Sequence, residues 1–193
     1  MSRDQRILRA AEKLFHERSF DGTGVDAIAR EAGITGSGVY RHFGSKAAIL
    51  LALMEEVADT LLERVGSPLS DHREDLELLL TTHAAVVDEQ PRLVDVWRRE
   101  QHNLAPPDAA EFHARQRLYV DRWVPTLDAC HPGHTRSELV TAMHAVHDLL
   151  TSDSSRRRDG AGSGAPAQQL LVHMARAALD ALSLDPAVPA PRT

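Results

Sequence analysis

The sequence predicts an all-α protein of about nine helices, and three observations favour that fold class. Apolar residues recur with helical spacing along most of the 193-residue chain. Hydrophobic residues make up 42% of the sequence but aromatic residues only 4%, so the core must consist mainly of Leu, Val and Ala, which favours helix packing. No stretch shows the alternation of a half-buried strand. We therefore expect a three-helix N-terminal head followed by a helical C-terminal body.

The composition and charge narrow the class of protein. Cys130 is the only cysteine, so no internal disulfide is expected. No segment approaches the roughly 18 apolar residues of a membrane span, and the N-terminus lacks an apolar signal region, so we expect a cytoplasmic protein. The net charge of −6 is uneven, because residues 1–50 carry +2 and residues 51–193 carry −8. A mildly basic head on an acidic body fits local contact with phosphate groups.

The first helix is expected from Ser2 to Arg18. Ser2 and Gln5 have the spacing of a capping box, in which two side chains satisfy free backbone groups at a helix start. Apolar residues then recur on one face at helical period, which predicts that this face is buried. The residues of that face are Ile7, Ala10, Ala11, Leu14 and Phe15.

Two short helices and the start of a third are expected between Thr23 and Lys46. Thr23 is expected to cap the first of them, with Asp26 as the returning half of a capping box. Gly33 lies where a left-handed residue ends a helix, and Thr35 is placed to cap the second helix. Two helices joined by a short turn with a glycine are the arrangement that lays a helix in the DNA major groove.

The body is expected to begin with a long helix from Ser45 to about Val65, roughly 30 Å in length. Pro125 lies inside a later helical pattern and is expected to kink that helix or end it early. Arg156, Arg157 and Arg158 are expected at the end of the helix that starts at Thr135. The remaining helices are expected at residues 71–90, 92–104, 108–127, 135–150 and 166–183, with a loop at 159–166.

The first fifty residues resemble the TetR/AcrR family of bacterial transcriptional repressors. The resemblance covers about a quarter of the chain and implies a helix-turn-helix head on a helical body that binds an effector and dimerises. The domains it implies are residues 1–46 for DNA binding and 47–184 for effector binding and dimerisation. The prolines near the C-terminus separately predict a disordered tail at residues 185–193. The residues that carry the resemblance are Arg6-Ile7-Leu8, Ala10-Ala11, Leu14-Phe15, Phe20, Ile28-Ala29, Ala32-Gly33-Ile34, Val39-Tyr40, His42-Phe43 and Ser45-Lys46-Ala47.

The resemblance also assigns candidate DNA contacts. Tyr40, His42 and Lys46 match the phosphate-contacting positions of the family, where such contacts set register without reading sequence. Arg41 is the best candidate for a bidentate contact with guanine, with Ser37 beside it. Ser19 stands where the family usually has glycine, so it must avoid a positive φ or tolerate it. The complete predicted DNA-binding set is Thr23, Thr35, Gly36, Ser37, Tyr40, Arg41, His42 and Lys46.

Two further sites are expected in the body. An apolar pocket there would take a small apolar or amphipathic effector. Two late helices with apolar stripes would pair with those of a second copy, which places two heads on two half-sites. The predicted pocket residues are Met54, Val57, His83, Trp97, Tyr119, Trp123, Met143, His144 and His147. The predicted dimer residues are Leu139, Met143, Val146, Leu150, Leu171, Met174, Ala178 and Leu182.

One alternative comes from the histidines. His144, His147 and Asp148 have one-turn helical spacing and could belong to a metal-dependent HD-type phosphohydrolase or to a metal-sensing regulator. His83 and Asp180 could complete such a centre, but nothing in their spacing requires it. The prediction is therefore a regulator rather than an enzyme, with no cofactor and no catalytic or metal-binding residues. Its partners would be double-stranded operator DNA, a small-molecule effector and a second copy of the chain, without a membrane. An effector that packs better when the long helix tilts would move the heads apart and relieve repression.

Overall fold

The computed structural model describes residues 1–152 and 165–183, and within them the chain forms nine α-helices and no strand. The prediction of an all-α fold with about nine helices is confirmed. The three arginines at 156–158, most of the predicted loop at 159–166 and the predicted tail at 185–193 lie outside the described residues. The α-helices are α1 (Arg3–Arg18), α2 (Val25–Glu31), α3 (Gly36–His42), α4 (Lys46–Val65), α5 (His72–Glu89), α6 (Pro91–Glu100), α7 (Pro106–Cys130), α8 (Arg136–Thr151) and α9 (Ala165–Asp180), and the short 3-10 helices are η1 (Gln101–Asn103) and η3 (Ala181–Ser183).

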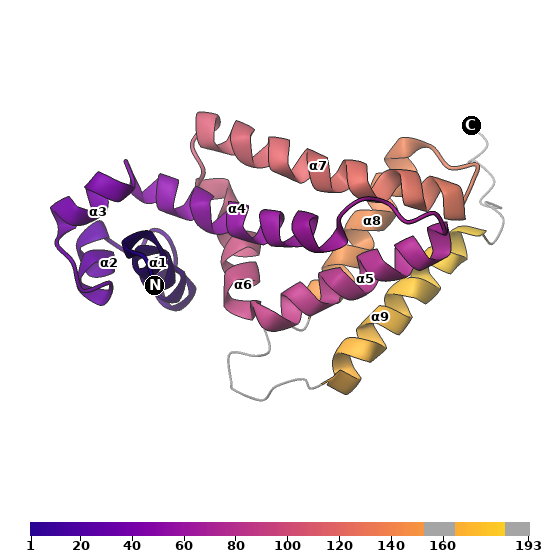
Figure 1. The fold of residues 1–193 in the computed structure, drawn as a ribbon, viewed down its shortest axis with the longest axis horizontal. Helices are drawn as coiled ribbons and strands as arrows, with labels where there is room; N and C mark the ends of the chain where they lie inside the picture. Colours follow the sequence, from indigo (N-terminus) through magenta and orange to yellow (C-terminus); the bar gives the residue numbers. More distant parts are fainter. Residues whose placement is uncertain (153–164, 184–193) are drawn as a thin grey trace, which may run out of the picture.

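The head and the body lie at opposite ends of an elongated molecule (Figure 1). Helices α1, α2 and α3 form the head, and α4 runs from the head into the body, where it lies alongside α7. Helices α5 and α7 contact each other, α8 contacts both, and α9 packs on α5 and α8. The short helix α6 contacts α1, α4 and α5, so it touches the head as well as the body. We call residues 1–46 the head and the later residues the body.

The buried core is continuous from the head to the body. It begins with Ile7 and Phe15 on α1, passes through Leu50 and Met54 on α4, and extends to Trp123 on α7. All five side chains are almost completely buried. Because α4 contributes buried residues at both ends, its start is fixed to the head and its later turns to the body. None of the helices in the described part of the chain is both long and apolar enough to cross a membrane.

Several predicted helix boundaries are confirmed. Ser2 forms a capping box with Gln5 at the start of α1, and Thr135 forms one with Glu138 at the start of α8. These side chains satisfy backbone groups that the first helical turn leaves free. Gly33 has φ +68° and ends α2, which is the backbone conformation that glycine adopts without strain.

Other boundary predictions were wrong. Gly24, not Thr23, is the N-cap of α2, because the Thr23 side chain points into the head. The helix expected at residues 92–104 ends as α6 at Glu100 and continues only as η1. Of the kink and the early end expected at Pro125, the early end does not occur, because α7 continues to Cys130. Buried side chains on both sides of Pro125, including Trp123 and Leu127, pack into the core, and this packing offsets the lost backbone hydrogen bond.

Candidate nucleic-acid interface and body cavity

A polar surface groove of about 530 Å³ lies on the head between the start of α1 and the helix-turn-helix. It brings together four predicted DNA-binding residues, Thr35, Ser37, Arg41 and His42. All four are exposed, and so is Tyr40, a residue with 57% of its surface exposed. A large aromatic residue left in solvent does not serve the core, so Tyr40 is free to contact a partner.

Helix α3 is short, and its first turn is held by local contacts. The Thr35 hydroxyl accepts a hydrogen bond from the Gly38 backbone N–H at 3.1 Å and lies 3.1 Å from the Ser37 hydroxyl. At Gly36, an added Cβ would lie 2.7 Å from the Asp26 carboxylate. A side chain at Gly36 would therefore meet the Asp26 carboxylate of α2, which would have to move to make room for it.

Two predicted DNA-binding residues have partners inside the head. Thr23 is only 1% exposed, and its hydroxyl donates to the carbonyls of Leu14 (3.2 Å) and Ser19 (2.8 Å). The prediction that Thr23 contacts phosphate was therefore wrong. The Lys46 ammonium donates to the carbonyls of Phe20 (2.8 Å) and Thr23 (3.0 Å). This lysine joins the start of α4 to the loop before α2, and its contact with DNA stays a prediction.

The structure adds charged residues that the sequence analysis missed. Arg3 and Arg6 on α1 line the same groove as Arg41 on α3. Their three-residue spacing on the first helix was the available signal, because it puts both side chains on one face. Asp4, between them, contacts His42, with 2.5 Å between Oδ1 and Nδ1. The groove is cationic overall, and one carboxylate already binds its histidine.

The body contains a cavity of about 570 Å³ with a largely apolar interior. It lies between α4, α5, α6, α7 and α8, which supply its lining residues together with Gln101 of η1. Seven predicted pocket residues line it: Val57, His83, Trp97, Tyr119, Met143, His144 and His147. Met54 and Trp123 do not, since both are fully buried in the core behind it.

Two stacked imidazole rings form one wall of the cavity. The rings of His83 and His147 have centroids 4.1 Å apart and an interplanar angle of 14°. His83 Nδ1 lies 3.2 Å from the Tyr119 hydroxyl, and Trp123 meets the His147 ring edge-on at 4.8 Å. Burial lowers the pKa of His83 to about 4, and burial next to His83 and His144 lowers the pKa of His147 well below its usual value. Both imidazoles are therefore neutral at pH 7.

The described residues contain no group of three His, Cys, Asp or Glu side chains placed to hold a metal ion. His147 stacks on His83 and Tyr119 instead of sharing a centre with His144 and Asp148, which are both exposed. The geometry of this cluster thus gives no support to the phosphohydrolase alternative.

The predicted dimer residues divide into two groups. Leu139, Met143, Val146 and Leu150 on α8 are all nearly fully buried in the chain's own core, so the prediction that they form a dimer surface was wrong. On α9, Met174 is 47% exposed, Ala178 is exposed and Leu171 is half-buried, and Leu182 on η3 is also half-buried. Leu170, which the sequence analysis did not include, is 60% exposed on the same helix.

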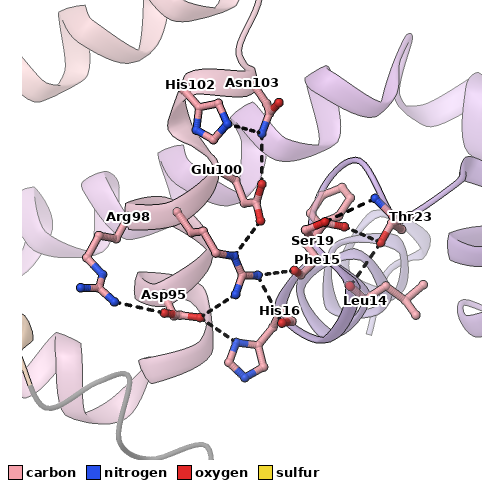
Figure 2. A network of polar contacts seen from close by, with 12 residues as sticks. Leu14, Phe15, His16, Ser19, Thr23, Asp95, Arg98, Glu100, His102 and Asn103 are labelled. Atoms are coloured by element: carbon pink, nitrogen blue, oxygen red, sulfur yellow. Dashed lines mark hydrogen bonds and ion pairs between the residues drawn. The ribbon is translucent and has the colours of Figure 1, made fainter.

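A polar network joins α6 to the end of α1, as Figure 2 shows. The Arg99 guanidinium donates to the carbonyls of Phe15 (2.6 Å) and His16 (3.2 Å). It also contacts Asp95 at 3.3 Å and Glu100 at 2.8 Å. His16 Nδ1 lies 3.2 Å from the Asp95 carboxylate, which is buried. The last carbonyls of α1 are therefore held by a side chain from the body.

The head matches a known family in sequence. Residues 7–53 match the family model described as "Bacterial regulatory proteins, tetR family". The HTH-type transcriptional activator FasR of Mycolicibacterium smegmatis is 34% identical over 39% of this chain and 37% of its own length. The HTH-type transcriptional repressor KstR2 of Rhodococcus jostii is 30% identical over 64% of this chain and 62% of its own length. The chain therefore spans less than two thirds of either relative.

Solved structures share the fold over nearly the whole chain. The crystal structure of AibR in complex with isovaleryl coenzyme A and operator DNA superimposes with a TM-score of 0.74. The superposition covers 90% of this chain and 96% of AibR, at 19% sequence identity. At that sequence identity, the superposition shows that the two proteins share the fold of both the head and the body, and nothing more.

Proposed function

The chain belongs to the tetR family of bacterial regulatory proteins, which are regulators and not enzymes, and from that premise we propose that it represses transcription by binding an operator and leaves it when an effector fills the body cavity. Residues 1–46 would contact DNA, and residues 47–184 would bind the effector and form the dimer. The observation that carries the proposal is the head groove, where exposed α3 side chains meet two arginines of α1.

The contacts in that groove divide by chemistry. Tyr40, His42 and the two α1 arginines would donate to phosphate oxygens, which fixes the position of the head without reading bases. Arg41 and Ser37 would reach base edges, and the fork of Arg41 suits the O6 and N7 atoms of guanine. Phosphate would displace Asp4 from His42, since a duplex presents a row of negative charges.

The cavity supports the effector part of the proposal. A volume of about 570 Å³ with apolar walls and a few polar groups is typical of a site for a small molecule. The similar AibR structure holds isovaleryl coenzyme A together with operator DNA. FasR is an activator and KstR2 is a repressor, so these relatives do not decide between activation and repression. The choice of repression here rests on the tilting mechanism proposed for α4.

The α4 helix connects the two sites. Its first turn is tied to the head by Lys46, and its later turns line the cavity through Val57 and Leu61. A ligand shifts an equilibrium only by its difference in affinity for the two states. An effector that fits the cavity better when α4 tilts would change the separation of the two heads in a dimer and weaken operator binding.

The direct test is selection of DNA duplexes from a random pool by the purified protein, followed by titration of the selected sequence. We expect salt-dependent binding, a loss of both affinity and base preference in Arg41→Ala, and unchanged binding in Arg92→Ala, an exposed position on α6. Recovery of no preferred sequence by the wild-type protein would contradict the proposal.

A further inference from the structure

The cationic side chains of the cavity gather at its rim. Arg98 on α6 and Arg117 on α7 are exposed residues that line the cavity, and His113 and His144 lie on the same rim. Among the described residues that line the cavity, Asp148 is the only acidic one. This balance is opposite to that of the body, where residues 51–193 carry a net charge of −8. An acidic protein surface generally repels anions. A cationic rim around an apolar cavity would instead attract an anion to that one place.

Arg98 has a second contact that leads away from the cavity. Its guanidinium lies 3.6 Å from the buried Asp95 carboxylate, one turn earlier on α6. Asp95 in turn contacts Arg99 and His16, and Arg99 donates to the last carbonyls of α1 (Figure 2). A side chain at the cavity rim is thus the first member of a continuous chain of contacts that ends in the head.

Helix α6 therefore has two functional faces within ten residues. Val94, Trp97 and Arg98 face the cavity. Asp95 and Arg99 face α1. The network between them is electrostatic and largely buried at Asp95, which is 1% exposed, so a change in its charge balance is weakly screened by solvent.

We propose that the effector is an amphipathic anion whose apolar part fills the cavity and whose charged group binds Arg98 and Arg117 at the rim, and that Arg98 transmits this binding to the head. This rests on the proposed function, because it names the ligand class and the coupling of the same cavity. The anion competes with Asp95 for Arg98. Asp95 then interacts more strongly with Arg99 and His16. The hydrogen bonds from Arg99 to the carbonyls of α1 change as a result.

Ligand class is tested with amphiphiles of equal length and different charge: decanoate, decanol and decylamine, and, as an aromatic set, 4-phenylbutyrate, 4-phenylbutanol and 4-phenylbutylamine. Binding is followed by tryptophan fluorescence, since Trp97 lines the cavity. We expect the carboxylate of at least one set to bind about tenfold more tightly than its alcohol and the amine to bind least, in keeping with a charge-assisted contact. Equal binding of the three charge types, or no binding by either set at millimolar concentration, overturns the assignment.

Single variants test the contribution of Arg98 and of Arg117 to ligand binding one at a time. Arg117→Gln and Arg98→Gln should each lower carboxylate affinity about tenfold and leave alcohol affinity within about twofold. Arg92→Gln, on the same helix as Arg98 but away from the cavity lining, is the matched control and should change neither. Loss of alcohol and carboxylate affinity to the same extent would show that the arginines only shape the cavity, and would overturn the proposed role.

The coupling between the cavity and the head is measured at a saturating concentration of the carboxylate, where differences in carboxylate affinity between variants no longer affect the result. Saturated wild-type protein and saturated Arg117→Gln should release a selected DNA duplex to the same extent, whereas saturated Arg98→Gln should release about tenfold less. Equal release by Arg98→Gln overturns the role of Arg98 as the link. If no variant binds DNA at all, the proposed function fails, and the fluorescence ranking of the amphiphiles still decides the ligand class.

Discussion

Ser19 is the one non-glycine residue with a positive φ among the described residues. Its φ of 63° and ψ of 170° lie in a region that glycine alone occupies without strain. It follows α1, and its carbonyl accepts the hydrogen bond from the Thr23 hydroxyl. That contact and the packing of Phe20 against Phe15 hold the backbone in this conformation. The sequence raised two outcomes for Ser19, and the structure shows that the strain is tolerated.

Replacement of Ser19 by glycine should stabilise the protein by about 1 kcal/mol, because relief of the strain exceeds the extra entropy of the unfolded glycine chain. The measurement is the midpoint of thermal unfolding, expected to rise by about 2–4 °C for a chain of this size. Ser19→Ala keeps the Cβ and loses only a long contact from the Gly22 N–H at 3.4 Å, so it should not be stabilised. A Ser19→Gly protein that melts below the wild type would show that the backbone is not strained there.

The buried imidazole pair should make stability depend on pH. Burial lowers the folded-state pKa of His83 to about 4 and lowers that of His147 as well, while both titrate near 6.5 in the unfolded chain. A lowered folded pKa contributes stability that is fully present above 6.5 and is lost as the pH falls toward 4.

We therefore expect the urea midpoint of the wild type to fall between pH 7 and pH 5. In His83→Gln this decline should be clearly shallower, even though the variant is less stable at pH 7. A decline of equal steepness in both proteins would mean that other groups control the pH dependence.

Among the single helices, α6 contacts α1, α4 and α5. Arg99 on α6 donates hydrogen bonds to the head. Its guanidinium binds two backbone carbonyls of α1 and two acidic side chains, Asp95 and Glu100, that are almost completely buried. Removal of the guanidinium leaves buried acceptors and carboxylates with one fewer donor, which is more costly than the loss of a surface pair.

Arg99→Gln should lower the free energy of unfolding by about 1–3 kcal/mol, less than a fully buried pair because a third of the side chain is exposed. Denaturation by urea measures this change. Arg92→Gln on the same helix should lie within about 0.5 kcal/mol of the wild type, as exposed substitutions usually do. Hydrogen exchange should show faster opening of the last turn of α1 in Arg99→Gln only, and identical exchange in the two variants would contradict the role assigned to Arg99.

The helices themselves were predictable from the sequence, because capping residues and apolar periodicity are local signals. Ser2 and Thr35 cap the helices they were expected to cap. Partners across elements were not predictable. The pattern on α8 could not reveal that Leu139 and Met143 face the chain's own core, since an apolar stripe is the same for a core and for a dimer.

The polar contacts of the site illustrate the same limit. Nothing local in the sequence shows that Lys46 would bind the carbonyl of Phe20, 26 residues earlier, or that Arg99 would bind that of Phe15, 84 residues earlier. The histidines were predicted to line the pocket because they lie on or near apolar helix faces. Their stacking depends on the side-by-side arrangement of α5 and α8, which only the fold supplies.

In the whole molecule, operator binding requires two heads at a fixed separation. A dimer addresses two half-sites about 34–36 Å apart, which one head cannot do. The surface that fits this role is the exposed apolar face of α9, where Leu170, Met174 and Ala178 follow one another at four-residue spacing. Exposed apolar side chains in such a row are typical of an interface between subunits.

We predict that Leu170→Glu combined with Met174→Glu shifts the protein from dimer to monomer, because two carboxylates would have to be buried in the interface. Sedimentation equilibrium measures the mass. Leu118→Glu, a similarly exposed leucine on α7, is the control and should leave the dimer intact. A monomeric wild type, or a dimeric double variant, would rule out the α9 surface.

If the head binds DNA through the cationic groove, binding must depend on salt concentration. With a selected duplex, the logarithm of the association constant should fall linearly and steeply with the logarithm of salt concentration, since each phosphate contact releases counterions. Arg6→Gln should reduce the slope by about one, and Arg92→Gln should leave it unchanged. Binding that is absent or does not change with salt, or an Arg6→Gln slope equal to that of the wild type, would contradict the account.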